Sequence, residues 1–476
     1  MKPERSDSMK HVLFAASECT PFIKSGGLAD VIGSLPQALV KEGARVSVIL
    51  PLYKEIINSE YRGDMEEVMI FNTPVGWRNQ YTRILKYEGR DVTYYFVDNE
   101  YYFSRDGLYG YIDDGERFVY FSNAIIEFMY RVEESYDILH CHDWQTGAAV
   151  AIGSIKRPHP GMKTVYTIHN IQYQGWIEQS AFSELFNLGR EHFAGFEWQG
   201  MLNMMKAAIH HADVITTVSE TYAEEIMTPF FGEGLEQVLE YRRGDLHGVI
   251  NGLDTYDYNP VRDEALYHRY RSSRKTKAKN KTALQQDLGL TVDENIPMYG
   301  IVTRLVNQKG IDLVEHIMHE FLAEDVQLVV LGSGEALYED YFKSLVHNFP
   351  DKVHVTLGFS ESYARKIYAA SDFFIMPSLF EPCGLGQLIA IRYLTSPIVR
   401  ETGGLKDTVI PYNEFAYSGN GFSFENYNAH ELLNAMKYSL YIYHQKEHMD
   451  ALCRNMTASD YSWANSARQY MSLYGG

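Results

Sequence analysis

Short runs of apolar and β-branched residues recur along this chain, each followed by a segment with a helical pattern, and this alternation constrains the fold most. It predicts parallel sheets with crossover helices. We expect a first series of strands at residues 11–16, 45–50, 138–141, 164–169, 214–218 and 246–250. A second series is expected at residues 298–302, 326–331, 353–357, 373–376 and 398–400. Residues 251–260, which contain Gly, Asn and Pro, connect the two.

The length of 476 residues exceeds what one hydrophobic core usually organises. We therefore predict an α/β chain with two doubly wound, Rossmann-like domains, residues 1–248 and 249–460, that face a deep cleft. An insertion at residues 53–137 is rich in Tyr and Phe. We expect these rings mainly in cores and on sheet faces, with stacking platforms for sugar rings as the alternative.

The formal net charge of -19 argues against a general affinity for nucleic acid or for anionic membrane surfaces, because both need basic patches. One dense basic run, residues 269–281, contains seven Lys or Arg side chains. Its polar interruptions favour a solvated helix face over an anion site. An anionic substrate must then be bound by a few local cations.

Four cysteines lie far apart without a CxxC pair, so the sequence supports neither a disulfide framework nor a zinc site of familiar spacing. Reduced thiols fit a cytoplasmic protein. No run approaches the ~18 apolar residues that a membrane span needs, and the first apolar stretch is too short for the core of a signal peptide. We expect a soluble, cytoplasmic protein with no membrane partner.

The segment Lys24-Ser25-Gly26-Gly27-Leu28-Ala29-Asp30 follows the first expected strand and precedes an apolar helical pattern. Glycines at a helix start let backbone N–H groups approach an anion, the helix dipole adds positive potential, and Lys24 supplies a full charge. The segment predicts a phosphate cradle, with a structural turn as the alternative.

Two further expected strands end in polar groups. His142 and Asp143 follow one strand, and His169 and Asn170 follow another. Metal binding is a poor interpretation, because successive residues of a strand point to opposite faces. His140 and His142 would share one face while Asp143 turns away, and no third ligand lies nearby. Polar groups that line a sugar pocket explain the pattern better.

In the second series, Arg304 and Lys309 lie five residues apart across a strand-to-helix turn, where both can converge on one pyrophosphate. Glu381 precedes a loop with Gly384 and Leu385, and it can accept hydrogen bonds from sugar hydroxyls. The alternative for Glu381 is a capping acid at a helix N-terminus.

Together these segments resemble the bacterial glycogen synthases and plant starch synthases, a family of retaining glycosyltransferases with the GT-B fold. The resemblance extends from about residue 11 to the C-terminus. It rests on motifs that occur in family order: Lys24 to Val31, His142-Asp143-Trp144, His169-Asn170, Asn251-Gly252-Leu253-Asp254, Arg304, Gln308-Lys309-Gly310 and Glu381-Pro382-Cys383-Gly384-Leu385.

The resemblance implies that Arg304 and Lys309 bind the diphosphate of the donor, with Lys24 and Gly27 assisting from the other domain. Glu381 is expected to hold the transferred glucose. Asp143, His169 and Asn170 are expected to line the acceptor and glucosyl subsites. Lys24, His169, Arg304, Lys309 and Glu381 form the expected catalytic set, and Asp30, Asn251, Gly384, Leu385 and Thr402 are further expected substrate contacts. The family uses no metal or cofactor, and its last helix, here within 461–476, returns to the N-terminal domain.

The function expected from the resemblance is transfer of glucose from ADP-glucose to the nonreducing end of glycogen or a maltooligosaccharide. Phe359 stands where the family commonly has Tyr near the base, so base selectivity is open. The alternatives are a GT-B transferase that uses UDP-glucose or a small acceptor, a phosphorylase with pyridoxal phosphate, and a non-catalytic glucan-binding protein.

Overall fold

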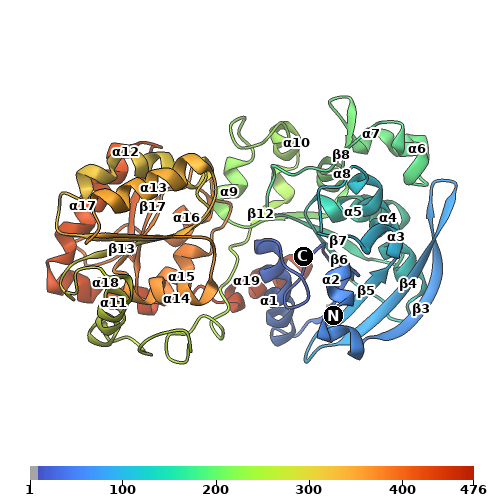
Figure 1. Ribbon diagram of the computed structural model, residues 1–476. Coiled ribbons are helices and arrows are strands. Elements are labelled where there is room, and N and C mark those ends of the chain that lie inside the picture. The colour runs from blue at the N-terminus through green and yellow to red at the C-terminus, as the bar shows by residue number, and fades with distance from the viewer. Residues whose placement is uncertain (1–8, 476) are drawn as a thin grey trace, which may run out of the picture. The chain divides into compact units, whose positions relative to one another are not determined.

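The computed structural model describes residues 9–475 and divides into two compact units. Of the described residues, one unit holds 9–252 and 463–475, and the other holds Leu253–Ser462. Every strand expected in the two series is present, with ends that differ by no more than one or two residues. The α/β prediction is therefore confirmed for each unit taken by itself (Figure 1).

The larger sheet of the N-terminal unit has nine strands in the described chain, in the order β12-β11-β7-β6-β1-β2-β5-β4-β3. From one edge to the other they are Leu246–Gly248, Val214–Thr217, Lys163–Ile168, Ile138–His142, His11–Ala15, Arg45–Pro51, Thr93–Asp98, Arg78–Glu88 and Glu66–Val75. Strands β12 to β5 pair in parallel, whereas β4 is antiparallel to both of its neighbours. The β3–β4 hairpin forms one edge of the sheet (Figure 1). A second, short sheet is formed by β8 (Trp176–Ile177), β10 (Met201–Asn203) and β9 (Glu197–Trp198).

Strand order reverses between β1 and β6, which both pair in parallel with their neighbours. All five residues of β1 are buried, as a central parallel strand covered on both faces requires. Open α/β sheets bind ligands outside the carboxyl ends of the strands at such a reversal. Ligands of this unit are therefore expected at the segments after Ala15 and His142.

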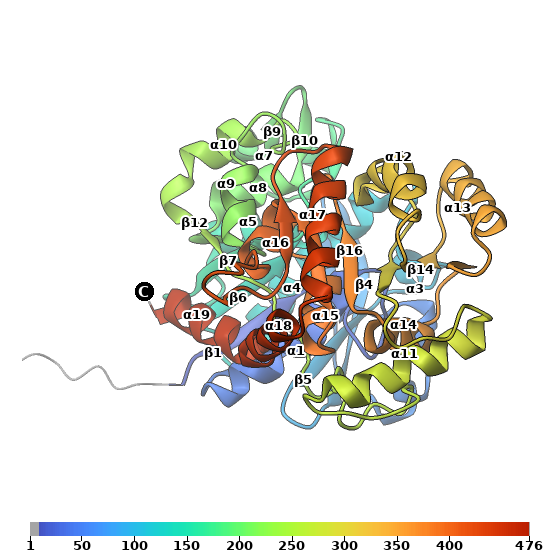
Figure 2. The ribbon, with the colours of Figure 1, turned by 90° about the vertical axis from the view of Figure 1, so that its left-hand side faces the viewer.

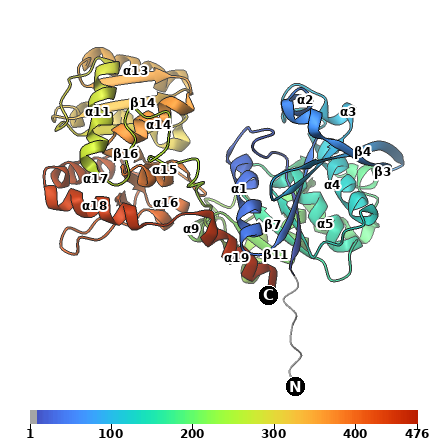
Figure 3. The ribbon, with the colours of Figure 1, turned by 90° about the horizontal axis from the view of Figure 1, so that it is seen from below.

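Helices flank this sheet, and the last of them joins it from the far end of the sequence. The longer ones are α1 (Gly27–Lys41), α4 (Asp114–Arg131), α5 (Gly147–Lys156), α8 (Met204–His211) and α19 (Trp463–Gly475). Helix α19 packs beside α1, as two views show (Figures 2 and 3). The Tyr474 hydroxyl lies 2.7 Å from His140 Nδ1, and the Ser466 hydroxyl donates to Ile250 O. The C-terminal segment is thus part of the N-terminal unit.

The sheet of the C-terminal unit has six parallel strands in the described range, in the order β15-β14-β13-β16-β17-β18. They are Val353–Leu357, Gln327–Gly332, Met298–Val302, Phe373–Met376, Ser396–Arg400 and Phe422–Phe424. Renumbered from β13, this order is the 3-2-1-4-5-6 of the dinucleotide-binding fold. Its reversal lies between β13 and β16, so ligands are expected after Val302 and Met376.

Helices cover both faces of the C-terminal sheet (Figure 1). On one face lie α12 (Ile311–Phe321), α13 (Ala336–Asn348) and α17 (Ala429–Tyr443), and on the other lie α11 (Arg274–Leu288) and α14 (Glu361–Ala370). The remaining helices are α15 (Gly386–Arg392), α16 (Gly403–Thr408) and α18 (Lys446–Ala458).

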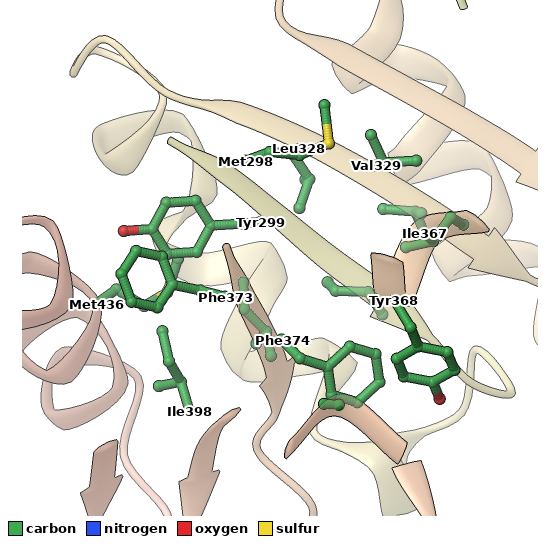
Figure 4. Packing of buried hydrophobic residues seen from close by; sticks show 14 of the residues in the cluster. Met298, Tyr299, Leu328, Val329, Ile367, Tyr368, Phe373, Phe374, Ile398 and Met436 are labelled. Atoms are coloured by element: carbon green, nitrogen blue, oxygen red, sulfur yellow. The ribbon is translucent and has the colours of Figure 1, made fainter. Parts of the chain in front are cut away.

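The core between these layers is apolar and aromatic (Figure 4). Tyr299 on β13 stacks on Phe373 on β16, with ring centroids 5.0 Å apart, and Phe374 packs against Tyr368. Both strands at the reversal are therefore held by their own side chains, which fixes where their carboxyl ends emerge.

The basic run differs from its prediction. It forms much of α11, but Lys277 and Lys281 are buried, with 6% and 2% of their surfaces exposed. Lys277 Nζ donates to the carbonyls of Tyr368 and Ala369, while Lys281 Nζ lies 2.6 Å from Asp372. The prediction of a solvated face is wrong at these two positions, because the acceptors that bind them come from segments distant in sequence.

The aromatic insertion at residues 53–137 is mainly core, as expected. Tyr94, Tyr95 and Tyr102 are buried, whereas Tyr101 is 65% exposed. Strands β3, β4 and β5 within this insertion, and β18, lie outside the predicted series.

Candidate functional site

The N-terminal site begins at Glu18, three residues after β1. Only 4% of Glu18 is exposed, and its carboxylate accepts hydrogen bonds from the backbone N–H groups of Ser25 (2.5 Å) and Gly26 (3.1 Å). The Ser25 hydroxyl also donates to it. The Tyr109 hydroxyl, 2.7 Å from Ser17 Oγ, lies 3.4 Å from Glu18 Oε1. A protein carboxylate therefore stabilises the positive end of α1.

This arrangement changes the predicted phosphate cradle. Two of the loop's N–H groups bind Glu18, so they are not available to a ligand in this structure. The N–H of Gly27 lies one residue further into the first helical turn, where N–H groups lack intrahelical partners. A Cβ placed on Gly27 meets nothing within 4 Å, so the space before it is open. Lys24 Nζ lies 2.8 Å from Asp30 Oδ1 in an exposed ion pair.

Asp143 organises the second half of this site. Its carboxylate oxygen Oδ1 accepts hydrogen bonds from the backbone N–H groups of His169 (2.7 Å) and Asn170 (3.3 Å). Its own N–H donates to Thr167 O, and its φ of 56° turns the chain sharply after β6. Burial raises the pKa of Asp143 from 3.8 to about 7. Asp143 therefore ties the end of β6 to the end of β7.

Three histidine rings lie next to one another at the ends of β6 and β7. His140 and His142 lie on the same face of β6 with ring centroids 4.3 Å apart, as the strand alternation predicted. His142 Nδ1 is 2.9 Å from His169 Nε2. Burial lowers the pKa of His169 to about 3 and the pKa values of the other two well below their ordinary range. All three rings are neutral at pH 7, so they supply hydrogen bonds and no charge.

The C-terminal site lies at the reversal between β13 and β16. Arg304 follows β13, is exposed, and donates to Gln308 Oε1 over 3.3 Å. Lys309 Nζ lies 2.5 Å from Glu381 Oε2, which also accepts from the Ser378 hydroxyl at 3.1 Å. The side chain of Lys309 is 15% exposed and that of Glu381 is 10% exposed. The Lys309–Glu381 pair and Arg304 thus both lie at the strand reversal where this fold binds nucleotides.

Two glycines let the backbone segments of this site approach each other. Gly310 has a φ of 72°, and a Cβ there would lie 2.1 Å from Pro377 O. Gly403 has a φ of 44°, and its Cβ would lie 2.0 Å from Glu381 O. Arg400 Nε donates to Ser378 O and so holds the same loop from β17. The position of Glu381 is therefore set by three loops at once.

The other predicted residues lie around these groups. Gly384, with a φ of 74°, and Leu385 lie between Glu381 and α15, while Thr402 is fully buried before α16. Asn251 is buried three residues after β12, in the segment that leads out of the N-terminal unit. The substrate roles of all these residues stay predictions.

Sequence reasoning missed two of these groups. The contacts of Glu18 with the glycine loop could have been predicted from one feature of the sequence, which is the position of this carboxylate just after the first strand. For Ser378, three residues before Glu381, the sequence offers no signal beyond its position after a strand. Within residues 9–475, no group of three or more His, Cys, Asp or Glu side chains is placed to hold a metal ion. No helix in that range is long and apolar enough to cross a membrane.

Comparison with known proteins gives consistent matches over nearly the whole chain. The model of the starch synthase catalytic domain matches residues 11–241, and that of glycosyl transferases group 1 matches residues 283–455. The chain is 55% identical to a glycogen synthase of Oceanobacillus iheyensis, with 98% of each chain covered. It is 51% identical to one of Exiguobacterium sibiricum, with 97% of this chain and 98% of the other covered.

Two solved structures share the fold. The catalytic domain of starch synthase IV from Arabidopsis thaliana, bound to ADP and acarbose, has a TM-score of 0.88 at 32% identity and covers 98% of this chain and 99% of its own. Sucrose-phosphate synthase from Thermosynechococcus elongatus has a TM-score of 0.59 at 18% identity, with 98% of both chains covered, and shows the fold alone.

Proposed function

The chain belongs to the family of bacterial glycogen synthases and plant starch synthases, and from that membership we propose how its two sites act together. The chain is a retaining glucosyltransferase with the GT-B fold. It transfers glucose from ADP-glucose to the nonreducing end of an α-1,4-glucan. ADP-glucose is a substrate, and no cofactor takes part in the proposed reaction.

The observation that carries the proposal is the Lys309–Glu381 pair beside Arg304 at the strand reversal of the C-terminal sheet. A departing diphosphate carries two or more negative charges, and neutralising it is the main electrostatic demand of the reaction. Arg304 can bind phosphate oxygens as a fork and Lys309 as a point charge. Glu381, held in place by Lys309, is available to accept hydrogen bonds from glucose hydroxyls.

The N-terminal site would hold the acceptor. Asp143 positions the backbone of His169 and Asn170, whose polar groups line this site, and the neutral imidazoles add no charge to compete with the cations. Gly27 and Lys24 lie at the start of α1, where an N–H group and a cation can assist a phosphate. The ion pair of Lys24 with Asp30 is exposed, so its exchange for a phosphate costs little.

In the proposed step the 4-hydroxyl oxygen of the glucan end forms a bond to the anomeric carbon of the donor. The bond from that carbon to the phosphate oxygen breaks, and the hydroxyl proton passes to the departing phosphate. Reaction on one face retains the configuration. The step needs orientation and charge stabilisation, which the residues described here can supply without a general base of their own.

The donor nucleotide is proposed to be ADP, supported by the ADP in the Arabidopsis relative. A cytoplasmic location is likewise proposed, since all four cysteines are buried and unpaired. The net charge of -19 supports no partnership with nucleic acid.

The test is incubation with labelled ADP-glucose or UDP-glucose and maltooligosaccharides, followed by separation of the products by length. Stepwise lengthening with release of ADP supports the proposal. Three other results would each contradict the proposal. Transfer from UDP-glucose alone would indicate a UDP-glucose transferase, and transfer only to small acceptors would indicate a small-acceptor transferase. Glucan binding without consumption of donor would indicate a non-catalytic glucan-binding protein.

A further inference from the structure

The C-terminal unit contains a cavity of about 680 Å³ that is separate from the strand reversal and from every residue of the proposed reaction. Its volume lies within the range of roughly 300 to 1,000 Å³ that small-molecule sites occupy. It lies between the start of the unit, helix α15 and the end of helix α18. Nothing in the proposed reaction uses it.

The cavity is built on both segments that connect the two units. Leu253, the first residue of the C-terminal unit, and Tyr461, next to its last residue, both line it. The N–H of Leu253 donates to Tyr461 O over 2.7 Å, so the two connecting segments are bonded to each other at this point. A molecule in the cavity therefore contacts both connections.

One wall of the cavity is apolar. Leu388 and Ile391 contribute from α15, Met456 contributes from α18, and Leu253 completes the wall. Each is less than 5% exposed, so the core holds these side chains in place and each presents a small part of its surface to the cavity. Aliphatic carbons together with a polarisable thioether suit the flat face of an aromatic ring.

Two arginines line the same cavity. Arg271 has no hydrogen bond or ion pair with any described residue, and Arg392 uses only Nε, which donates to Tyr258 O over 3.2 Å. Asp460 is the acidic side chain among the lining residues described, and its carboxylate accepts from the Ser462 N–H. Guanidinium groups without an ion pair to a described carboxylate are suited to a phosphate, which they bind with two parallel hydrogen bonds.

Hydroxyl groups complete the lining. Thr255 and Ser272 lie around the cavity along with the arginines and the apolar wall, whereas the hydroxyl of Tyr461 donates to Thr408 O. We propose that this cavity binds a nucleoside monophosphate, with the base on the apolar wall, the ribose among the hydroxyls and the phosphate on Arg271 and Arg392. The site is additional to the donor site, and its occupancy does not depend on the proposed function.

The test is hydrogen exchange on the full chain, with AMP as the probe. We expect AMP at millimolar concentration to protect residues 253–261 and 456–461. Arg271→Gln combined with Arg392→Gln should weaken this protection by about tenfold in AMP concentration, because two charge-assisted contacts to the phosphate are lost. The matched control is Arg269→Gln, an exposed arginine two positions away that pairs with Glu264 and should leave the protection unchanged.

Three outcomes overturn the inference: no protection of those two segments by AMP, equal protection in the double variant, or equal protection by adenosine or by inorganic phosphate at the same concentration. Protection of residues 304–310 reports the proposed donor site separately. A failure of the donor-site assignment is therefore distinguishable from a failure of this inference.

Discussion

Replacing Lys309 by Met, alone and together with a change of Glu381, separates the contribution of this ion pair to stability from its contribution to turnover. Lys309 Nζ lies 2.5 Å from Glu381 Oε2, and the two side chains retain 15% and 10% of their exposure. Removing one partner of a buried pair costs about 3–5 kcal/mol, because the other charge remains buried without it. The Ser378 hydroxyl, 3.1 Å away, is too weak a donor to compensate. We expect Lys309→Met to destabilise the C-terminal unit by about that amount.

The double variant Lys309→Met with Glu381→Gln removes both charges. Since paired removal of buried charges is often near neutral, stability should return to within about 1 kcal/mol of the original protein. Activity should not return, because the cation that stabilises the departing diphosphate is still absent. A loss of about 10²–10³ in turnover is expected for one such electrostatic contact.

Hydrogen exchange of β13 and β16 in increasing denaturant measures the stability of the unit, and release of ADP from ADP-glucose with a maltooligosaccharide measures turnover. Lys437→Met is the matched control, since its pair with Glu320 is 44% and 58% exposed and such pairs contribute only about 0–1 kcal/mol. A stable Lys309→Met variant refutes the burial argument. An active double variant refutes the role of Lys309 in the reaction.

Three further predictions concern the surroundings of the two sites. Glu18→Gln replaces the carboxylate that accepts from the N–H groups of Ser25 and Gly26 by a weaker amide acceptor. We expect the free energy of unfolding to fall by about 1–3 kcal/mol and the KM for the donor to rise. An unchanged melting temperature and unchanged kinetics would contradict this. Because burial raises the pKa of Asp143 to about 7 in the folded state, its contribution to stability is full below pH 4 and is lost as pH rises towards 7. Asp143→Asn should therefore melt at least as high as the original protein at pH 8 while losing turnover, and a lower melting temperature would count against the assignment. Gly403→Ala would place a Cβ 2.0 Å from Glu381 O and should reduce both the melting temperature and the rate of ADP release. The control is Gly244→Ala, whose Cβ would have no other atom within 4 Å and which should change neither measurement.

The strands of both units could be predicted because central parallel strands are buried on both faces and must read as short apolar runs. The sequence indicated Met298–Val302, Val353–Leu357 and Phe373–Met376 without error at either end. The lysines of α11 could not be predicted in the same way. Lys277 and Lys281 lie in a basic, polar segment that is typical of an exposed helix face. They are buried because the carbonyls of Tyr368 and Ala369 accept from Lys277 and because Asp372 pairs with Lys281.

The candidate site shows the same division. The presence of Arg304, Lys309 and Glu381 after apolar runs could be read along the chain, because each lies at the end of a locally encoded strand. Occupation of the glycine loop by Glu18 could not, since a carboxylate and a ligand phosphate satisfy the same N–H groups and the sequence does not distinguish them.

By itself the sequence determined the element types, the family motifs and the residues that end each strand, because periodicity and turn chemistry depend on near neighbours. Only the tertiary structure decided the strand order, and with it the reversals at which those ends meet. It also decided the pairing of Lys309 with Glu381 across 72 residues of chain and the assembly of a cavity from both connecting segments. Such contacts depend on how long loops close and which layers pack, and no local pattern encodes them.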